Sequence, residues 1–317
     1  MTPFVSIITP LYNKAAYIGE TIASVLAQTF ADWELLVVDN NSTDGGPALV
    51  RAIPDKRVKL LSCTKRGASA ARNAGLDAAR GEWAVFLDAD DMLRPDYVES
   101  QLAAAKRAPD ANLVVCSYEE FVEGAPEKTV IKHALNGELS KARLLDSAIV
   151  YAPGPTHLFL IARGLVGSAL RWPENLDTLL GEDAYFWFVV LNEAIVAFNP
   201  LPLARYRFLA PGSRFTTLSD AQTMFTGLHA AITENIQYLA QRDRPVTAGQ
   251  AEFLMRFYGG LYLESQRTGK SELTAQALHE ASRWLGYCLK TADHPRIALR
   301  LRSWLGLPAF TKLFHRI

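Results

Sequence analysis

The feature that most constrains the fold is an alternation of short apolar runs with helical patterns over about the first 120 residues. The runs are nearly continuous in hydrophobicity and rich in β-branched and aromatic residues, as in parallel strands that are covered on both faces. They lie at Phe4–Thr9, Trp33–Asp39, Val58–Ser62, Trp83–Asp88 and Leu113–Ser117. The helical patterns between them lie at Tyr17–Ala27, Gly46–Ala52, Ser69–Ala79 and Pro95–Ala108. This alternation predicts a doubly wound α/β sheet, in which ligands bind at the carboxyl ends of the strands.

After about residue 118 short extended pieces mix with helices. The extended pieces are Thr129–Lys132, Thr156–Ala162 and Leu203–Phe208, and the helical patterns are Ser140–Ala148 and Glu182–Asn192. From Ser219 the chain is helical, in the segments Ala221–Gln241, Ala248–Gln266 and Glu272–Leu289. We therefore expect an α/β domain over residues 1–215, made of a first half (1–117) and a smaller half (118–215), and then a helical region over 216–317.

Composition and charge exclude several functional classes. The 317 residues include 33 basic and 33 acidic ones, so the chain lacks the positive charge typical of nucleic-acid-binding proteins. Its three cysteines are far apart and support neither a disulfide framework nor a thiolate zinc site. The first residues do not have the pattern of a signal peptide, and no run of apolar residues is long enough for a membrane-spanning helix. We expect a cytoplasmic protein without a nucleic-acid partner.

Acidic residues gather where two of the apolar runs end. One run leads into Asp39-Asn40-Asn41-Ser42-Thr43-Asp44-Gly45, and another leads into Asp88-Ala89-Asp90-Asp91. Each acid alone fits plain helix capping, but two clusters at equivalent strand ends should meet in one crevice, where a cation must neutralise them. Mg²⁺ or Mn²⁺ takes oxygen ligands and commonly joins carboxylates to substrate phosphates. In an extended segment Asp88 and Asp90 would share a face.

Five motifs, in order along the chain, resemble those of family 2 glycosyltransferases. They are Val5-Ser6-Ile7-Ile8-Thr9-Pro10-Leu11-Tyr12-Asn13, Val38-Asp39-Asn40-Asn41-Ser42-Thr43-Asp44-Gly45, Gly67-Ala68-Ser69-Ala70-Ala71-Arg72-Asn73-Ala74-Gly75, Phe86-Leu87-Asp88-Ala89-Asp90-Asp91 and Gly181-Glu182-Asp183. The resemblance covers about residues 4–215. It implies a GT-A-type, doubly wound mixed sheet with a nucleotide-sugar-binding half, a smaller acceptor half and a helical C-terminal extension.

The resemblance also implies a nucleotide-diphosphate sugar as the donor. Asp39 would accept a hydrogen bond from the ring N–H of the base, which suits uracil or thymine and leaves guanine open. Arg72 would supply positive charge near the base or the phosphates. Asp90 would bind Mn²⁺ or Mg²⁺, which bridges the diphosphate, and Asp88 would face the ribose or the metal. The implied donor-binding residues are Thr9, Pro10, Tyr12, Asp39, Asn41, Arg72, Asp88 and Ala89, and the implied metal ligands are Asp90 and Asp88.

Glu182 and Asp183 are the candidate catalytic residues. By the resemblance, Asp183 is the general base that takes the proton of an acceptor hydroxyl while its oxygen attacks C1 of the sugar. Such a direct displacement inverts the anomeric configuration. Both acids also fit the first turn of a helix, where the helix dipole stabilises a carboxylate. The apolar run Tyr185-Phe186-Trp187-Phe188 predicts a buried helix and favours the functional interpretation.

Four further residues are weaker candidates. The role of Asp91 is left open, and Arg207 or Arg214 would serve the diphosphate, because Tyr206-Arg207 is not followed by the His that family members often carry. We expect the loop that contains them to become ordered only over bound donor. His157 is a lone histidine beside an apolar run and fits either a structural role or the lining of an acceptor site.

Residues 290–317 are the part of the chain for which we consider a peripheral membrane contact. From Lys290 to Arg316 there are six basic residues and one acid, Asp293, among large apolar residues. A helix of this kind can lie on the inner face of an anionic membrane, near a lipid-linked acceptor, but a helix packed on the rest of the protein has the same pattern. The preceding helices would serve acceptor recognition or self-association as a homo-oligomer.

These observations together predict a metal-dependent, inverting glycosyltransferase. It would move a sugar from a UDP-sugar to a hydroxyl of a saccharide or lipid-linked saccharide, in the synthesis of a surface polysaccharide or glycolipid. A nucleotidyltransferase is the alternative, but it would need a Gly-rich phosphate loop where this chain has Pro10-Leu11-Tyr12-Asn13-Lys14. A dinucleotide-binding oxidoreductase would need G-x-G-x-x-G at the same place. A non-catalytic sugar-nucleotide-binding protein is the third interpretation, and the joint presence of Asp39, Asp88, Asp90 and Asp183 argues against it.

Overall fold

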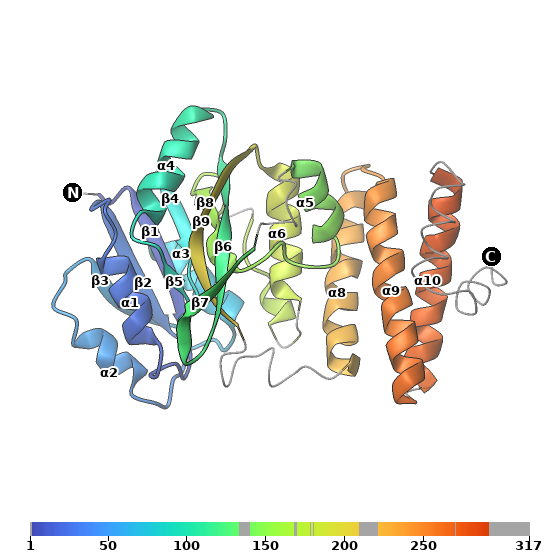
Figure 1. Cartoon of the computed structure of the whole chain (residues 1–317), viewed down its shortest axis with the longest axis horizontal. Helices are drawn as coiled ribbons and strands as arrows, with labels where there is room; N and C mark the ends of the chain where they lie inside the picture. Colours follow the sequence, from blue (N-terminus) through green and yellow to red (C-terminus); the bar gives the residue numbers. More distant parts are fainter. Residues whose placement is uncertain are drawn as a thin grey trace.

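The computed structural model describes residues 2–132, 140–167, 170–177, 179, 181–208, 221–269 and 271–291. Within these residues, one mixed sheet lies at one end of the molecule and a row of helices lies at the other (Figure 1). The strands are β1 (Val5–Leu11), β2 (Trp33–Asp39), β3 (Val58–Ser62), β4 (Trp83–Phe86), β5 (Met92–Leu93), β6 (Leu113–Val122), β7 (Ala125–Lys132), β8 (Phe159–Ala162) and β9 (Val196–Phe208). The helices are α1 (Ile18–Leu26), α2 (Gly46–Arg51), α3 (Ala68–Ala78), α4 (Tyr97–Arg107), α5 (Lys141–Ala148), α6 (Glu182–Glu193), α8 (Ala221–Ala240), α9 (Ala248–Thr268) and α10 (Ser271–Thr291).

The sheet has the strand order β3-β2-β1-β4-β8-β6-β9-β5, with β7 paired to β6. The four strands β3, β2, β1 and β4 are parallel, as the continuous apolar runs predict, and the helices between them provide the crossovers. Strand β8 lies antiparallel between β4 and β6. The predicted doubly wound, mixed α/β sheet is therefore confirmed.

Some element bounds differ from the prediction. Strand β4 ends at Phe86, before the acidic residues, and Thr156–Leu158 is a 3-10 helix that leads into β8. Strand β6 continues to Val122, so the expected division at residues 117 and 118 falls inside a strand that pairs with β7, β8 and β9. The expected boundary at residue 215 lies outside the described residues. The division into two halves and a helical region stays a prediction.

Helices α3 and α6 cover the same face of the sheet. Ile8 of β1 and Phe86 of β4 are register partners, so their side chains point to one side. Gly75 of α3 lies so close to Ile8 that an added Cβ would come within 2.4 Å of its Cγ2 atom. The ring of Phe86 meets that of Phe186, in α6, edge to face at 5.8 Å between centroids. The small residue in α3 and the aromatic one in α6 thus place both helices against the parallel strands.

Helices α8, α9 and α10 follow one another on the far side of α6 from the sheet (Figure 1). Thr247 and Gln250 form a capping box that starts α9, and Gly269, with φ of 73°, ends it. Among the described residues, none of the helices has both the length and the apolarity needed to cross a bilayer. The proposed membrane-contacting tail lies, beyond Thr291, outside the described residues.

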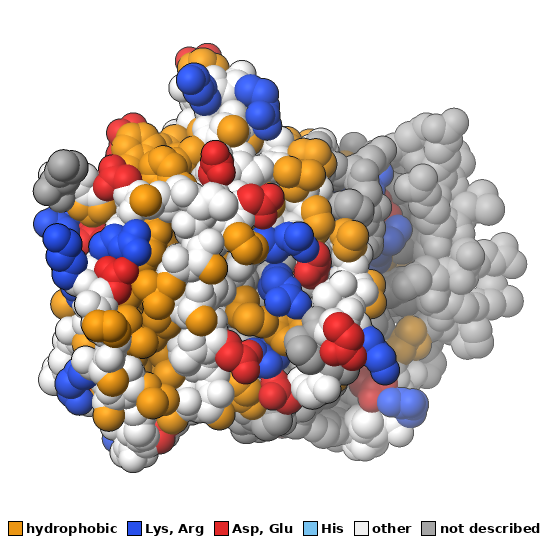
Figure 2. All heavy atoms as spheres, turned by 60° about the vertical axis from the view of Figure 1, so that its left-hand side comes forward, with side chains coloured by type: hydrophobic (Ala, Val, Ile, Leu, Met, Phe, Trp, Pro, Cys, Tyr) orange, Lys and Arg blue, Asp and Glu red, His pale blue; other side chains and the backbone are white. Residues whose placement is uncertain are grey.

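Charge of both signs is distributed over the end of the molecule that carries the parallel strands. On the face drawn in Figure 2, lysine and arginine side chains are interspersed with aspartate and glutamate. This distribution differs from the continuous basic stripe that is typical of nucleic-acid interfaces.

A buried glutamate near the start of β2 predicts a pH dependence of stability. Glu34 is 2% exposed and accepts hydrogen bonds from Ser6 Oγ at 2.9 Å, Lys59 Nζ at 2.8 Å and the backbone N–H of Arg80 at 2.9 Å. Burial alone would raise the pKa of Glu34, but hydrogen bonds from Lys59, Arg80 and Ser6 outweigh it and hold the pKa below its ordinary value of 4.5. The ionised form is therefore the one that the fold stabilises.

We expect Glu34→Gln to lower the free energy of unfolding by about 1–3 kcal/mol at neutral pH. A carboxylate with a depressed pKa contributes stability above its unfolded pKa and loses that contribution as the pH falls through the folded pKa. The difference between wild type and variant should thus shrink below pH 4.5. Urea unfolding of both proteins over a pH series measures this difference, and a constant difference would contradict the role of the ionised carboxylate.

Candidate active site

The loops that follow β1 and β2 are locked together at the carboxyl edge of the sheet. Asn13 and Asn41 have left-handed backbones, with φ of 51° and 65°, which asparagine tolerates better than most residues. Asn13 Oδ1 accepts a hydrogen bond from Thr43 N at 2.8 Å, and Asp44 Oδ2 accepts one from Ala15 N at 2.8 Å. These bonds fix the loop that follows β1 on both sides of Lys14, which lies between Asn13 and Ala15.

The implied base-binding residues lie at this edge with very different exposure. Asp39 ends β2 and accepts a hydrogen bond from Ser42 N at 3.0 Å, so one of its oxygens shapes the turn. Tyr12 is 58% exposed. Thr9, in contrast, is fully buried within β1, and its hydroxyl has no hydrogen-bond partner among the described residues. Pro10 is partly buried, and the side-chain amide of Asn41 donates to the backbone carbonyls of Cys63 and Thr64.

The acidic residues after β4 form a turn. The backbone N–H of Asp91 donates to the carbonyl of Asp88 at 3.1 Å. The segment is therefore a turn and not the extended strand in which Asp88 and Asp90 would share a face. The charges of Asp90 and Asp88 both raise the pKa of Asp91, so both carboxylates act on the same buried group. Ala89 is buried at the centre of this turn, and its carbonyl accepts a hydrogen bond from Thr21 Oγ1 at 3.0 Å.

Asp91 and His157 form a buried pair behind the turn. Both are almost inaccessible to solvent, and His157 Nδ1 lies 3.5 Å from Asp91 Oδ2. Burial, followed by the charges of Asp90 and Asp88, raises the pKa of Asp91 well above its usual range. Burial lowers the pKa of His157 to about 4. Asp91 also accepts a hydrogen bond from Arg207 N at 2.8 Å, so this pair supports the turn from inside the protein.

The guanidinium of Arg207 is occupied by protein groups. Its Nε donates to the carbonyl of Asp90 at 2.8 Å, its Nη2 pairs with Glu20 at 2.6 Å, and its Nη1 pairs with Glu123. The guanidinium also lies 4.9 Å from the centre of the Tyr17 ring. Arg207 thus joins the end of β9 to the acidic turn, and this arrangement leaves it poorly placed to serve a diphosphate. Arg214, the other candidate for that role, lies outside the described residues.

Arg72 connects the acidic turn with the start of α6, more than 90 residues further along the chain. Its Nη2 donates to Asp88 Oδ1 at 2.8 Å, and its Nη1 lies 3.9 Å from Glu182 Oε1. The guanidinium lies 4.3 Å from the centre of the Trp172 ring, and the side chain is only 6% exposed. Acidic side chains from two distant segments therefore lie next to the two terminal nitrogens, Nη1 and Nη2, of one guanidinium.

Glu182 and Asp183 begin α6. Glu182 is 6% exposed, whereas Asp183 is partly exposed. Asp183 Oδ1 accepts a hydrogen bond from Ala184 N at 2.8 Å, and Glu182 Oε2 accepts one from Gly181 N at 3.3 Å. Both acids thus bond to backbone N–H groups at the helix start, a position that acidic side chains favour. A carboxylate that stabilises a helix start can also act as a base, so the two roles are compatible here.

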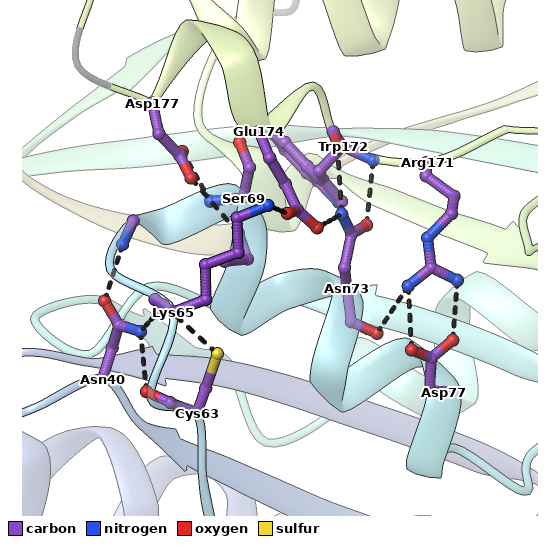
Figure 3. A network of polar contacts seen from close by, with 12 residues as sticks. Asn40, Cys63, Lys65, Ser69, Asn73, Asp77, Arg171, Trp172, Glu174 and Asp177 are labelled. Carbon is purple, nitrogen blue, oxygen red and sulfur yellow. Dashed lines mark hydrogen bonds and ion pairs between the residues drawn. The ribbon is translucent and has the colours of Figure 1, made fainter.

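A polar network joins α3, the helix that carries Arg72, to residues 171–177 (Figure 3). Asn73 and the backbone of Trp172 exchange two hydrogen bonds of 3.0 Å, and Arg171 forms a bidentate pair with Asp77. Asp177 Oδ1 accepts a hydrogen bond from Ser69 N at 2.7 Å and so caps α3 from 108 residues away. Lys65 and Glu174 form a further ion pair, beside Asn73 (Figure 3).

Sequence reasoning gave no role to these supporting residues or to Lys14. Asn73 lies inside a motif that pointed to Arg72, and its position beside Arg72 is the only signal that could have singled it out. The partners of Asn73 and Ser69 come from a loop about a hundred residues away, for which the sequence carries no local pattern. Lys14 belongs to a segment whose only informative feature in the sequence is the lack of a Gly-rich loop, so no pattern indicates its pairing with Asp90.

No metal centre formed by protein groups alone is present in the described part of the chain. There, no three or more His, Cys, Asp or Glu side chains are grouped so that they could hold an ion. Asp90 Oδ2 instead pairs with Lys14 Nζ at 2.7 Å.

A mixed sheet of this strand order, with an acidic turn after its parallel strand β4, is a fold of the GT-A type. Solved structures share this fold: residues 1–349 of TarS from S. aureus, in complex with UDP-GlcNAc, superimpose with a TM-score of 0.69 at 19% identity, over 98% of this chain and 88% of that one. Mannosyltransferase PcManGT from Pyrobaculum calidifontis, in complex with GDP-Man and Mn²⁺, gives a TM-score of 0.56 at 20% identity, over 99% and 86% of the two chains.

The family follows from the sequence comparisons. The model of the family described as "Glycosyl transferase family 2" matches residues 6–161, which hold β2 to β7 and most of β1 and β8. The chain belongs to glycosyltransferase family 2.

Curated relatives named for polysaccharide synthesis or sugar transfer match about a third of the chain. Succinoglycan biosynthesis protein ExoO of Rhizobium meliloti is 46% identical over 107 residues, which are 33% of this chain and 31% of ExoO. The Escherichia coli protein WfgD, named UDP-Glc:alpha-D-GlcNAc-diphosphoundecaprenol beta-1,3-glucosyltransferase, is 44% identical over 100 residues, which are 31% of this chain and 40% of WfgD. The matched stretches thus span well under half the length of these relatives.

Proposed function

We propose that this protein is a metal-dependent, inverting glycosyltransferase that transfers a sugar from a UDP-sugar to an acceptor hydroxyl. The observation that carries the proposal is the contact of Arg72 with both Asp88 and Glu182. This contact supports the proposal that the acids expected to serve the donor and the acid pair expected to serve the acceptor belong to one site. Family membership supports sugar transfer as the chemistry of that site.

The relatives support the choice of substrates. WfgD is named for a UDP-Glc donor and a diphosphoundecaprenol-linked acceptor, ExoO for succinoglycan biosynthesis, and TarS was solved with UDP-GlcNAc. We infer a uridine donor and a saccharide or lipid-linked saccharide acceptor for this chain as well, in surface polysaccharide or glycolipid synthesis. The carboxylate of Asp39 can only accept hydrogen bonds, so we assign it to bind the ring N–H of uracil. We assign the exposed Tyr12 to contact the face of the base.

The residues of the acidic turn fit a divalent cation that reaches the protein together with a diphosphate. Mg²⁺ and Mn²⁺ are commonly held by one or two carboxylates plus substrate phosphates, so a complete protein cage is not required. Asp90 is assigned to the metal because its partner is the flexible ammonium of Lys14, whereas Asp88 is paired with the buried guanidinium of Arg72. When bound, the cation would neutralise the charge that develops on the departing diphosphate. Asp91, buried behind the turn, is assigned to support rather than to metal binding.

Asp183 is assigned to the proton transfer. Its carboxylate takes the proton of the acceptor hydroxyl while the hydroxyl oxygen bonds to C1 of the sugar and the nucleotide diphosphate leaves from the opposite side. Glu182 is assigned to positioning, because it is buried beside Arg72 and bonds to the backbone at the start of α6. We propose that residues 1–215 form the catalytic domain and that residues 216–317 serve acceptor recognition.

A panel of nucleotide diphosphates in thermal-shift measurements, each with and without Mn²⁺, tests the proposed donor and metal. UDP with Mn²⁺ should raise the melting temperature, since a ligand at about 100 times its Kd stabilises a protein by about 2.7 kcal/mol. Asp90→Ala should abolish this shift, whereas Asp110→Ala, which changes an exposed aspartate after α4, should not. A UDP shift that is independent of metal would contradict the role of Asp90, and a larger shift with GDP would contradict the uridine assignment.

A further inference from the structure

The side chain of Lys14 is held against the acidic turn. Its Nζ donates to Asp90 Oδ2 at 2.7 Å, and the two side chains are only 16% and 17% exposed. The loop around Lys14 is fixed on both sides, because Asn13 bonds to Thr43 and the backbone of Ala15 bonds to Asp44. Nζ also lies 5.6 Å from the centre of the Tyr17 ring. This contact therefore differs from those of exposed surface lysines, which are weakly held.

Two arginines also lie near the turn, and each has acidic partners of its own. Arg72 is paired with Asp88, and Arg207 is paired with Glu20 and Glu123 and bonds to the backbone, not the side chain, of Asp90. Among the residues that the structure describes, Lys14 is thus the cation that neutralises the Asp90 carboxylate. A divalent ion would bind the same oxygen at about 2.0–2.2 Å, so the ammonium and the metal cannot both occupy that position.

We propose that Lys14 is a donor-binding residue that neutralises Asp90 in the free protein and moves to the diphosphate when metal and donor bind. The proposal rests on the function inferred above. A metal ion on Asp90 would repel the nearby ammonium, while the diphosphate that arrives with it offers oxygens as new partners. Lysine suits this exchange, because it binds phosphate as a point charge on a long, flexible side chain.

This role predicts that loss of the Lys14 charge changes two binding steps in opposite directions. Without the ammonium, the free protein should bind the metal more tightly, because a competing cation has been removed from Asp90. The metal-loaded protein should bind UDP more weakly, because one contact to the diphosphate is lost. A purely structural role for Lys14 would weaken both steps or neither.

The test is a titration of the full chain with Mn²⁺, read from the electron paramagnetic resonance signal of free Mn²⁺, followed by a calorimetric titration with UDP at saturating Mn²⁺. In Lys14→Met we expect Mn²⁺ affinity to rise and UDP affinity to fall, each by about fivefold or more. Lys14→Gln, which keeps a polar group of similar length without the charge, should show the same two changes. Circular dichroism confirms that both variants are folded.

The matched control is Lys59→Met. Lys59 also pairs with a carboxylate, Glu34, at 2.8 Å, but this pair lies along β3 and β2 and not at the acidic turn. It should leave both affinities unchanged. Wild-type values in Lys14→Met for either step would overturn the role of Lys14 while leaving the proposed function intact. A wild-type protein that binds neither Mn²⁺ nor UDP would overturn the proposed function and this role with it.

Discussion

Replacing Asp183 by asparagine is expected to slow sugar transfer by about 10²–10⁴-fold, the usual contribution of a general base. Asparagine keeps the size of the side chain and an oxygen that can still accept the hydrogen bond from Ala184 N. The start of α6 should therefore stay intact, and only the ability to take a proton is removed. UDP binding in the presence of Mn²⁺ should not change, because Asp183 is not assigned to the donor.

The matched control for this variant is Glu99→Gln. Glu99 also lies in the first turn of a helix, α4, where it accepts a hydrogen bond from Thr29 at 2.7 Å, and it is outside the proposed site. Transfer rates and UDP affinities are measured for wild type and both variants. Equal rates for Asp183→Asn and wild type would leave Asp183 with helix stabilisation as its only role.

The second large effect is expected for Gly181→Ala. A Cβ at residue 181 would lie 2.6 Å from the carbonyl oxygen of Gly227, in α8, and 3.0 Å from Cβ of Ala231. Backbone lies against backbone here, so either α8 or the start of α6 must shift. Overpacking of this kind costs about 1–3 kcal/mol. A displacement of about 1 Å in a catalytic group can slow a reaction by about 10²-fold, and we expect a loss of that size because Glu182 and Asp183 follow directly.

Gly19→Ala separates this steric effect from a general effect of the substitution. Residue 19 lies in the first turn of α1, and nothing lies within 4 Å of an added Cβ. We expect normal transfer and, in a helix, a gain in stability of about 0.5–1 kcal/mol. Rates, UDP affinities and urea unfolding are compared for the two variants. If Gly181→Ala transfers sugar at the wild-type rate, the position of α8 has no bearing on the acid pair.

The contact between Gly181 and Gly227 also bears on the helical C-terminal region. Helix α8 packs directly against the start of α6, because the backbone of Gly227 in α8 lies next to Gly181, just before the acid pair. Phe188 of α6 and Tyr238 of α8 also meet edge to face, at 6.1 Å between ring centroids. We expect a truncation that removes α8 to expose these surfaces and to impair the site, even if the helices have a further role in acceptor recognition.

Much of the fold could be predicted because its signals are local. The apolar runs of β2 and β3 gave the bounds of those strands, and the helical periods gave α2 and α3 to within a residue at either end. The positions of Asp39 and Asp88 at the carboxyl edge followed from the rule that parallel strands end at one edge. The exact geometry of the acidic turn did not follow, because a turn closed by Asp91 and Asp88 has no alternation that a pattern could reveal.

By itself, then, the sequence determined the order of the helices and strands apart from the short β5, the acidic residues at the end of β2 and after β4, and the family, since these depend on patterns within about 15 residues. Only the tertiary structure decided which charges meet. It joined Arg72 to Asp88 and Glu182, set Lys14 on Asp90, occupied Arg207 with Glu20 and Glu123, and placed Asp177 on α3. These contacts join residues from 16 to 187 positions apart. Side-chain partners at such separations are set by the packing of whole elements, and no local pattern encodes them.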